Sequence, residues 1–205
     1  MYNVLCHSSI KIEKDNKVIY FDPYKIKEDY SNADYIFCTH SHYDHFSPED
    51  IKRLIKLGTK LIVTKDVKKE AEKLVRKENI ITVEPEKEYK IDDLKVKTTY
   101  AYNIDKNFHP KEKKWVGYIV EINGEKYYIA GDTDDIPEIN NIECDIAFLP
   151  IGGTYTMDYK EAAVLANNIN TKIVVPTHYG EIVGDKDDGK RFAELVIERE
   201  VKILI

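Results

Sequence analysis

A chain of 205 residues with 42% hydrophobic and 11% aromatic residues has the composition of one globular domain, here residues 1–205. No apolar run approaches the roughly 20 residues of a membrane-spanning helix, and the N-terminus lacks the features of a secretory signal. We therefore expect a cytoplasmic protein without a membrane span. The net charge of −6 gives no overall attraction for a phosphate backbone, which argues against a nucleic-acid partner.

The first quarter of the chain has the pattern of short β-strands. Four runs rich in β-branched and aromatic residues occur at 2–6, 9–14, 17–23 and 34–40. The letters "DNK" between the second and third runs are typical of a hairpin turn. These runs predict a strand meander.

Helices then begin to alternate with strands. A helix is expected over 48–57, because Ser47 is a suitable N-cap, Pro48 suits the first helical position and Gly58 can close the end. A strand follows at 60–65. A second helix is then indicated by apolar residues at helical spacing, namely Val67, Ala71, Leu74 and Val75.

The middle of the chain returns to β-structure. The runs "IITVE" and "LKVKTTYAY" lead to a longer stretch at 115–132, in which the pair Asn123 and Gly124 is a strong hairpin signal. We expect two antiparallel strands on either side of that pair.

The last third again alternates strands with helices. A strand at 145–151 precedes a helix at 159–169, for which Asp158 and Glu161 form the pattern of a capping box. A strand at 172–178 follows. The chain then ends with a helix and a closing strand, at 188–199 and 201–205.

Strands followed by helices in both halves predict the α/β class. Each sheet has to bury one face on a partner and the other under helices. The expected architecture is therefore two sheets packed face to face with helices outside, within one domain.

The segment "CTHSHYDHFSPED" at 38–50 concentrates groups that bind protons and metals. Alternate side chains of an extended segment share a side, so His40, His42 and Asp44 can converge while His45 lies beyond them. Imidazole and carboxylate together suit Zn²⁺, Mn²⁺ or Fe. A lone histidine is usually structural, but this pattern directly after a buried strand predicts a site for more than one metal ion.

The motif "THSHYDH" at 39–45 resembles the signature of the metallo-β-lactamase superfamily. Further segments similar to that family's motifs follow its order: "YFDP", "NIDKNFHPKEKKWVGY", "YIAGDT" and "VPTHYG". The resemblance spans almost the whole chain and is most specific at 39–45. It implies a four-layer αββα sandwich with a metal site between the sheets.

The resemblance also implies a role for each motif residue. Asp132 is expected to bridge two metals, and Asp22 to support the site from behind the ligands. His7 lies in an "HSS" segment similar to those of the branch that resembles ascorbate-6-phosphate lactonase, where such segments lie near the pocket, although a structural histidine is an equal alternative. The ligands implied for one metal are His40, His42 and His109, and those for the other are Asp44, His45 and His178.

The implied activity is that of a binuclear metal-dependent hydrolase. Two divalent ions about 3.5 to 4 Å apart lower the pKa of a shared water near neutral pH. Zn²⁺ is the first expectation, with Mn²⁺ or Fe as alternatives. Asp44 and Asp132 would orient the hydroxide and relay its proton as the catalytic residues. The expected reaction is cleavage of an ester, lactone or phosphodiester bond in a small molecule.

Loops near the motifs are expected to carry specificity. Four lysines near His109 could meet an anionic substrate, although Glu112 among them favours a solvated loop; they are Lys106, Lys111, Lys113 and Lys114. The turn "IGGTYTMD" offers three candidates for substrate contact, namely Thr154, Tyr155 and Thr156.

Three other functions remain open at this point. An RNA-processing nuclease is disfavoured because no RNA-binding arm or second domain is evident and the chain is acidic. A mononuclear iron oxygenase acting on a persulfide could use the same histidines. A non-catalytic metal or ligand sensor is the third alternative, and the complete ligand set argues against it. The sequence does not indicate an oligomeric state.

Overall fold

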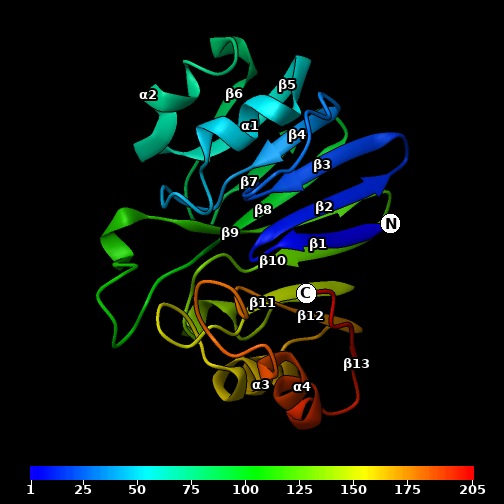
Figure 1. Cartoon of the computed structure of the whole chain (residues 1–205), viewed down its shortest axis with the longest axis vertical. Helices are drawn as coiled ribbons and strands as arrows, with labels where there is room; N and C mark the ends of the chain where they lie inside the picture. Colours follow the sequence, from blue (N-terminus) through cyan, green and yellow to red (C-terminus); the bar gives the residue numbers. More distant parts are fainter. The chain divides into compact units, whose positions relative to one another are not determined.

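The computed structural model describes residues 1–205, and the chain divides into two compact units, Met1–Glu84 and Pro85–Ile205. Each unit contains one β-sheet and its own helices (Figure 1). The predicted α/β class is confirmed, whereas the assignment of residues 1–205 to a single domain stays a prediction. None of the helices has both the length and the apolar character that crossing a bilayer requires.

The first unit, called the N-terminal unit, has a six-stranded sheet whose strands follow chain order. The strands are β1 (Tyr2–Cys6), β2 (Ser9–Lys14), β3 (Lys17–Phe21), β4 (Ala33–Phe37), β5 (Ile55–Thr64) and β6 (Ile80–Val83). The predicted hairpin between β2 and β3 is present, and its turn residues Asp15 and Asn16 have φ values of 51° and 59°.

The predicted meander is wrong beyond β3, because β3, β4, β5 and β6 are parallel to one another. Residues 22–32 cross over before β4, so β3 and β4 end at the same edge of the sheet. Parallel strands need such a crossover because a tight turn can only join antiparallel neighbours. The consequence is that Asp22, after β3, and the histidine motif, after β4, leave the sheet side by side.

Two helices cover one face of this sheet, α1 (Pro48–Leu54) and α2 (Lys68–Ala71). Ile51 and Leu54 of α1 are fully buried and share a hydrophobic core with Leu61 and Val63 of β5. The predicted cap of α1 is confirmed, since the Ser47 hydroxyl accepts a hydrogen bond from the Asp50 backbone N–H at 3.3 Å.

Helix α1 ends at Leu54, three residues before the predicted boundary. Ile55 adopts an extended conformation and pairs with Ala33 of β4. The Thr59 hydroxyl donates to the Ala33 carbonyl at 2.6 Å and accepts from the Lys56 N–H at 2.8 Å. This tertiary contact draws the segment into β5, and Gly58, at φ 89°, lies where the pairing register between β4 and β5 is irregular.

The second unit, called the C-terminal unit, has a seven-stranded sheet in the order β13-β12-β11-β10-β9-β8-β7. The strands are β7 (Glu88–Ile91), β8 (Leu94–Tyr100), β9 (Val116–Ile122), β10 (Glu125–Ile129), β11 (Ile146–Pro150), β12 (Ile173–Thr177) and β13 (Glu200–Val201). Neighbours from β7 to β10 are antiparallel, and those from β10 to β13 are parallel. Asn123 and Gly124 form the predicted turn between β9 and β10, with φ values of 48° and 79°.

The helices of this unit are α3 (Tyr159–Asn168) and α4 (Asp188–Leu195). Both hydrogen bonds of the predicted capping box at Asp158 and Glu161 are present. Buried alanine and leucine side chains of α3 share a core with Leu149 of β11 and Val174 of β12. Helix α4 ends four residues before the predicted boundary. The Asn167 side-chain amide donates to the Leu195 carbonyl, and its carbonyl accepts from the Ile197 N–H, so these groups bond to Asn167 instead of continuing the helix.

The capping box of α3 predicts a measurable contribution to stability. Asp158→Ala removes the acceptor for two backbone N–H groups, and should lower the free energy of unfolding by about 1 kcal/mol. Asp187→Ala is the matched control, because Asp187 is the N-cap of α4 but makes no side-chain cap hydrogen bond. Urea unfolding should show the larger loss for Asp158→Ala, and equal midpoints for the two variants would contradict the assignment.

Candidate metal centre

The histidine motif of the N-terminal unit forms a tight loop between β4 and α1. The backbone N–H groups of His45 and Phe46 both donate to the His42 carbonyl, at 3.0 and 2.8 Å. His40 and His45 are buried, whereas His42 is partly exposed. The loop therefore presents several imidazoles at one strand end, as the sequence predicts.

Asp22 holds this loop from the end of β3. Its carboxylate accepts from the Thr39 N–H, the Thr39 hydroxyl and His45 Nδ1, each at 2.7 Å. Asp22 is fully buried, and burial raises the pKa of its carboxyl group, an effect opposed by His45 and by the Thr39 hydrogen bonds. The backbone at Asp22 is left-handed, with φ 45°, which turns the carboxylate toward the loop.

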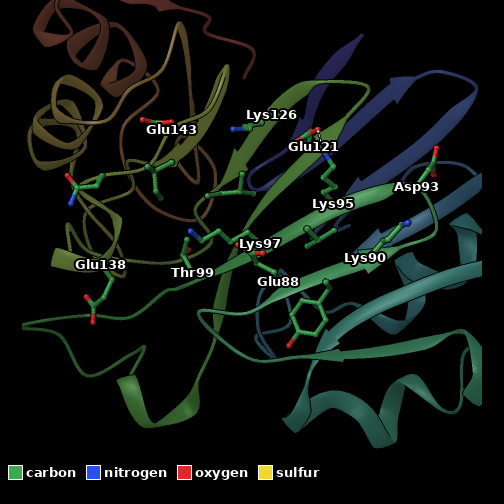
Figure 2. Close-up of a pocket in the computed structure, with 15 residues that line it drawn as sticks. Glu88, Lys90, Asp93, Lys95, Lys97, Thr99, Glu121, Lys126, Glu138 and Glu143 are labelled. Atoms are coloured by element: carbon green, nitrogen blue, oxygen red, sulfur yellow. Dashed lines mark hydrogen bonds and ion pairs between the residues drawn. The ribbon is translucent and has the colours of Figure 1, made fainter.

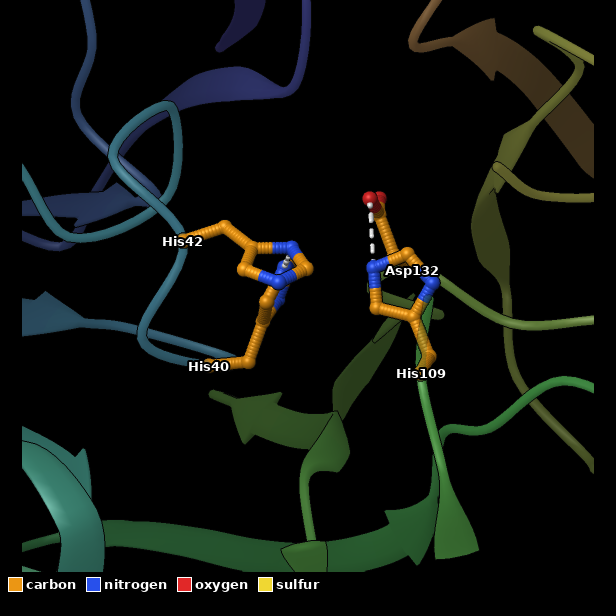
Figure 3. Close-up of side chains that lie close together, drawn as sticks. All are labelled: His40, His42, His109 and Asp132. Atoms are coloured by element: carbon orange, nitrogen blue, oxygen red, sulfur yellow. Dashed lines mark hydrogen bonds and ion pairs between the residues drawn. The ribbon is translucent and has the colours of Figure 1, made fainter. Parts of the chain in front are cut away.

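His40 and His42 lie close together (Figure 3). His40 Nε2 is 3.0 Å from His42 Nδ1, and His40 Nδ1 is 3.0 Å from the Thr39 hydroxyl. Since the hydroxyl donates to Asp22, it accepts a hydrogen bond from His40 Nδ1–H. Nε2 of His40 then offers a lone pair toward His42, and a proton or a cation must lie between two ring nitrogens at that separation.

Asp44 lies between His7 and His45. His7 Nε2 is 3.3 Å and His45 Nε2 is 3.6 Å from Asp44 Oδ2. His7 is completely buried in the turn between β1 and β2, where its φ is 54°. His7 is therefore a buried neighbour of the predicted ligand Asp44.

The C-terminal unit contains a second group of donors, centred on Asp132. Asp132 follows β10, His178 follows β12, and His109 lies in the loop between β8 and β9. Asp132 Oδ2 is 3.2 Å from His109 Nε2 and 3.0 Å from His178 Nε2. All three side chains are at most 3% exposed, and Figure 3 draws the His109 and Asp132 pair.

Asn103 orients His109, a role that no sequence motif indicated. Its side-chain carbonyl accepts from the His109 backbone N–H and from His109 Nδ1, both at 3.0 Å. The Tyr155 carbonyl lies 3.1 Å from the same Nδ1. Both groups are acceptors, so Nδ1 carries the proton and Nε2 presents its lone pair toward Asp132.

Asp134 in turn holds Asn103 and the loop around it. It accepts from the Asn103 amide at 3.2 Å, from the Ile104 N–H at 2.9 Å and from Lys106 Nζ at 2.6 Å. Lys106 is therefore ion-paired within the protein. Lys111 is likewise paired with Glu138, at 2.6 Å.

The turn at 151–158, which is predicted to contact substrate, also packs closely against His178. A Cβ on Gly152 would lie 2.3 Å from the His178 carbonyl and 3.0 Å from His178 Nδ1, so only glycine allows this approach. Thr156 is fully buried, and its hydroxyl donates to the Met157 carbonyl at 3.2 Å. Thr154 is exposed, and Tyr155 contributes its carbonyl to His109.

The chemistry of these donors suits a divalent metal. Histidines that bind metals usually donate the other ring N–H to a carboxylate or carbonyl, which fixes the tautomer. His45 has Asp22 in this position, and His109 has Asn103 and Tyr155. In each case Nε2 faces a carboxylate oxygen, a contact that is repulsive without a proton or cation between the two atoms. The donor sets of both units therefore fit cation binding.

A pocket of the C-terminal unit, with a volume of about 1120 Å³, has a different character (Figure 2). Its walls come mainly from β7, β8 and β9 and carry charges of both signs, such as Lys95 and Glu121, which are paired at 2.7 Å. No histidine lines it. It therefore lacks the donors that the sequence motifs supply.

Comparison with known proteins agrees with these donor sets. Residues 3–178 match the family model described as the beta-lactamase superfamily domain. A UPF0173 metal-dependent hydrolase from Lysinibacillus sphaericus is 31% identical over 221 residues, covering 97% of this chain and 93% of the relative.

Solved structures share the fold. The crystal structure of a candidate metal-dependent hydrolase from Parabacteroides distasonis has a TM-score of 0.84 and 30% identity, covering 99% of this chain and 91% of that one. A candidate zinc-dependent hydrolase of the metallo-beta-lactamase superfamily from Thermotoga maritima has a TM-score of 0.66 and 21% identity, covering 98% and 96%. The predicted fold class is thereby confirmed.

The contacts of Asn103 predict its effect on metal affinity. Asn103→Ala removes the side-chain acceptor for His109 Nδ1, so the dissociation constant for Zn²⁺ should rise by about 10- to 100-fold. Asn141→Ala, at an exposed position, is the control and should leave the constant unchanged. Isothermal titration calorimetry of the chelator-treated proteins with Zn²⁺ provides the measurement. Equal constants for both variants would show that Asn103 does not orient a ligand.

Proposed function

The chain belongs to the beta-lactamase superfamily, and from this membership we propose that it is a metal-dependent hydrolase that uses the histidine and aspartate donors of its sequence motifs. Relatives that share about 30% of its residues along nearly the whole chain carry the name of metal-dependent hydrolase. The observation that carries the proposal is the orientation of buried histidines by hydrogen bonds at Nδ1. That arrangement prepares Nε2 for a cation.

The proposed ligand sets follow the sequence motifs. One ion would take His40, His42 and His109, and the other would take Asp44, His45 and His178, with Asp132 serving both. Zn²⁺ is the first choice because imidazole and carboxylate suit it, and Mn²⁺ or Fe would accept the same donors.

When bound, two such ions would acidify a water molecule and polarise the bond to be cleaved. The protein's own groups contribute orientation and proton transfer. Asp44 and Asp132 accept hydrogen bonds from the attacking water and take its proton. Asp22 keeps His45 in position through a hydrogen bond, and His7 lies 3.3 Å from Asp44.

The proposed substrate is a small molecule with an ester, lactone or phosphodiester bond. The nucleophile is water, so no serine or cysteine of the chain has to form a covalent intermediate. Cys38 fits that expectation, because it is buried in the core beside β4 and burial raises the pKa of its thiol. The chemistry rests on the histidine and aspartate donors.

Two variants test the proposal at its centre. Asp132→Ala and His42→Ala should each lower turnover by about a hundredfold or more and reduce the bound metal, without unfolding the chain. Asp29→Ala is the matched control, since Asp29 is exposed and pairs only loosely with Arg53, at 3.3 Å. Turnover of bis-p-nitrophenyl phosphate and of a simple lactone, with metal content by plasma mass spectrometry, gives both readouts.

The outcomes separate the alternatives. About two equivalents of metal with turnover that both variants lose would support the hydrolase. One equivalent of iron without hydrolysis would favour an oxygenase, and bound metal without turnover of any ester would favour a sensor. Full activity of Asp132→Ala would eliminate the proposed mechanism.

A further inference from the structure

Two large apolar side chains lie exposed on the loop between β8 and β9, which carries His109. Phe108, the residue before His109, is 46% exposed, and Ile104 is 56% exposed. The ring of Phe108 meets the ring of Tyr155 at right angles, with 4.6 Å between the centroids. Single exposed apolar residues are ordinary, but a group beside a donor set is typical of a binding surface.

Tyr155 connects this group directly to the donor set. Its backbone carbonyl lies 3.1 Å from His109 Nδ1 and accepts from the Asn103 amide at 2.9 Å. The aromatic pair is therefore held at a fixed place relative to His109. A rigid aromatic surface loses little conformational entropy when a ligand binds to it.

The N-terminal unit has a comparable feature. Tyr43 lies between His42 and Asp44 and is 63% exposed. Its ring packs edge-on against Tyr24, with 5.8 Å between the centroids. Each unit thus has an exposed aromatic side chain next to one of its donors, Phe108 beside His109 and Tyr43 beside His42.

Two of the four lysines near His109 are neutralised within the protein, whereas Lys113 and Lys114 are exposed. Asp134 neutralises Lys106 at 2.6 Å, and Glu138 neutralises Lys111 at the same distance. The Lys111 ammonium also lies over the ring of Tyr102, 4.7 Å from its centroid. Two lysines that the sequence offered for an anion are therefore engaged within the protein.

Resting on the proposed function, we infer that the substrate carries an uncharged aryl group next to the bond that is cleaved, and that Phe108 and Tyr155 bind it. Aromatic rings prefer edge-to-face contacts, and each such pair contributes about 0.5 to 1.5 kcal/mol beyond the burial of area. A substrate ring would add a third ring to the existing pair. The class that fits is a neutral arylalkyl ester or lactone.

Three esters with one leaving group test the inference. They are ethyl phenylacetate, ethyl acetate and ethyl hydrogen succinate, whose alcohol carries no ring and whose acyl groups are arylalkyl, small and anionic, and acid release in a pH-stat gives the rates. The phenylacetate should have a kcat/KM about tenfold above that of the acetate, from about 1.4 kcal/mol of aromatic contact. The succinate should gain nothing over the acetate.

Phe108→Ala should lower the ratio of phenylacetate to acetate kcat/KM to near one, mainly through a higher KM for the phenylacetate. The control is Tyr30→Ala, which removes an aromatic ring of equal exposure, 45%, away from the motif residues and should leave the ratio unchanged. A purely structural role of the Phe108 and Tyr155 contact would lower the thermal unfolding midpoint and leave the ratio intact, which would overturn the inference. Preference for the succinate would overturn it as well.

A binding measurement keeps this test independent of catalysis. Saturation-transfer NMR should show phenylacetamide bound to the metal-loaded protein more strongly than acetamide, and Phe108→Ala should abolish the difference. If no ester is hydrolysed but this difference is present, the hydrolase proposal fails and the aryl site stands. If the two amides bind alike while esters are hydrolysed, the aryl site is wrong and the hydrolase proposal stands.

Discussion

Each donor set depends on a hydrogen bond at Nδ1 of a histidine, the ring nitrogen that does not face the other donors. The buried carboxylate of Asp22 accepts a hydrogen bond from His45 Nδ1, and the side-chain carbonyl of Asn103 accepts one from His109 Nδ1. An imidazole held in this way has one tautomer and one orientation. Without these acceptors, Nε2 would carry the proton in part of the population and would be a poor electron-pair donor. Both units thus reach the same electronic state with different chemical groups.

The direction of the strands explains where these residues lie in the fold. In each unit, key donors follow parallel strands: Asp22 and the histidine motif after β3 and β4, and Asp132 and His178 after β10 and β12. The carboxyl ends of parallel strands meet at one edge of a sheet, where ligands of open α/β sheets generally bind. The crossover after β3 and the change from antiparallel to parallel pairing at β10 are therefore what bring the donors of each unit together.

Local patterns predicted much of this arrangement. The hairpin at Asn123 and Gly124 and the capping box at Asp158 depend on neighbouring residues only, and both are present. The motif at 39–45 could be located because its spacing is local too. Asn103 could not be located, because its contact with His109 depends on how the loop between β8 and β9 folds back on itself and on the carbonyl of Tyr155, which is distant in the sequence. The early end of α1 has a similar origin, since Thr59 binds a different strand.

Three of the side chains discussed above sit on a left-handed backbone: φ is 54° at His7, 45° at Asp22 and 59° at His178. For a residue with a Cβ this conformation costs on the order of 1 kcal/mol. Glycine would relax each turn and at the same time delete an imidazole or a carboxylate. Selection for heat resistance alone would therefore favour glycine at positions that the proposed chemistry requires. Thermostable variants of this protein would have to be screened for function from the first round.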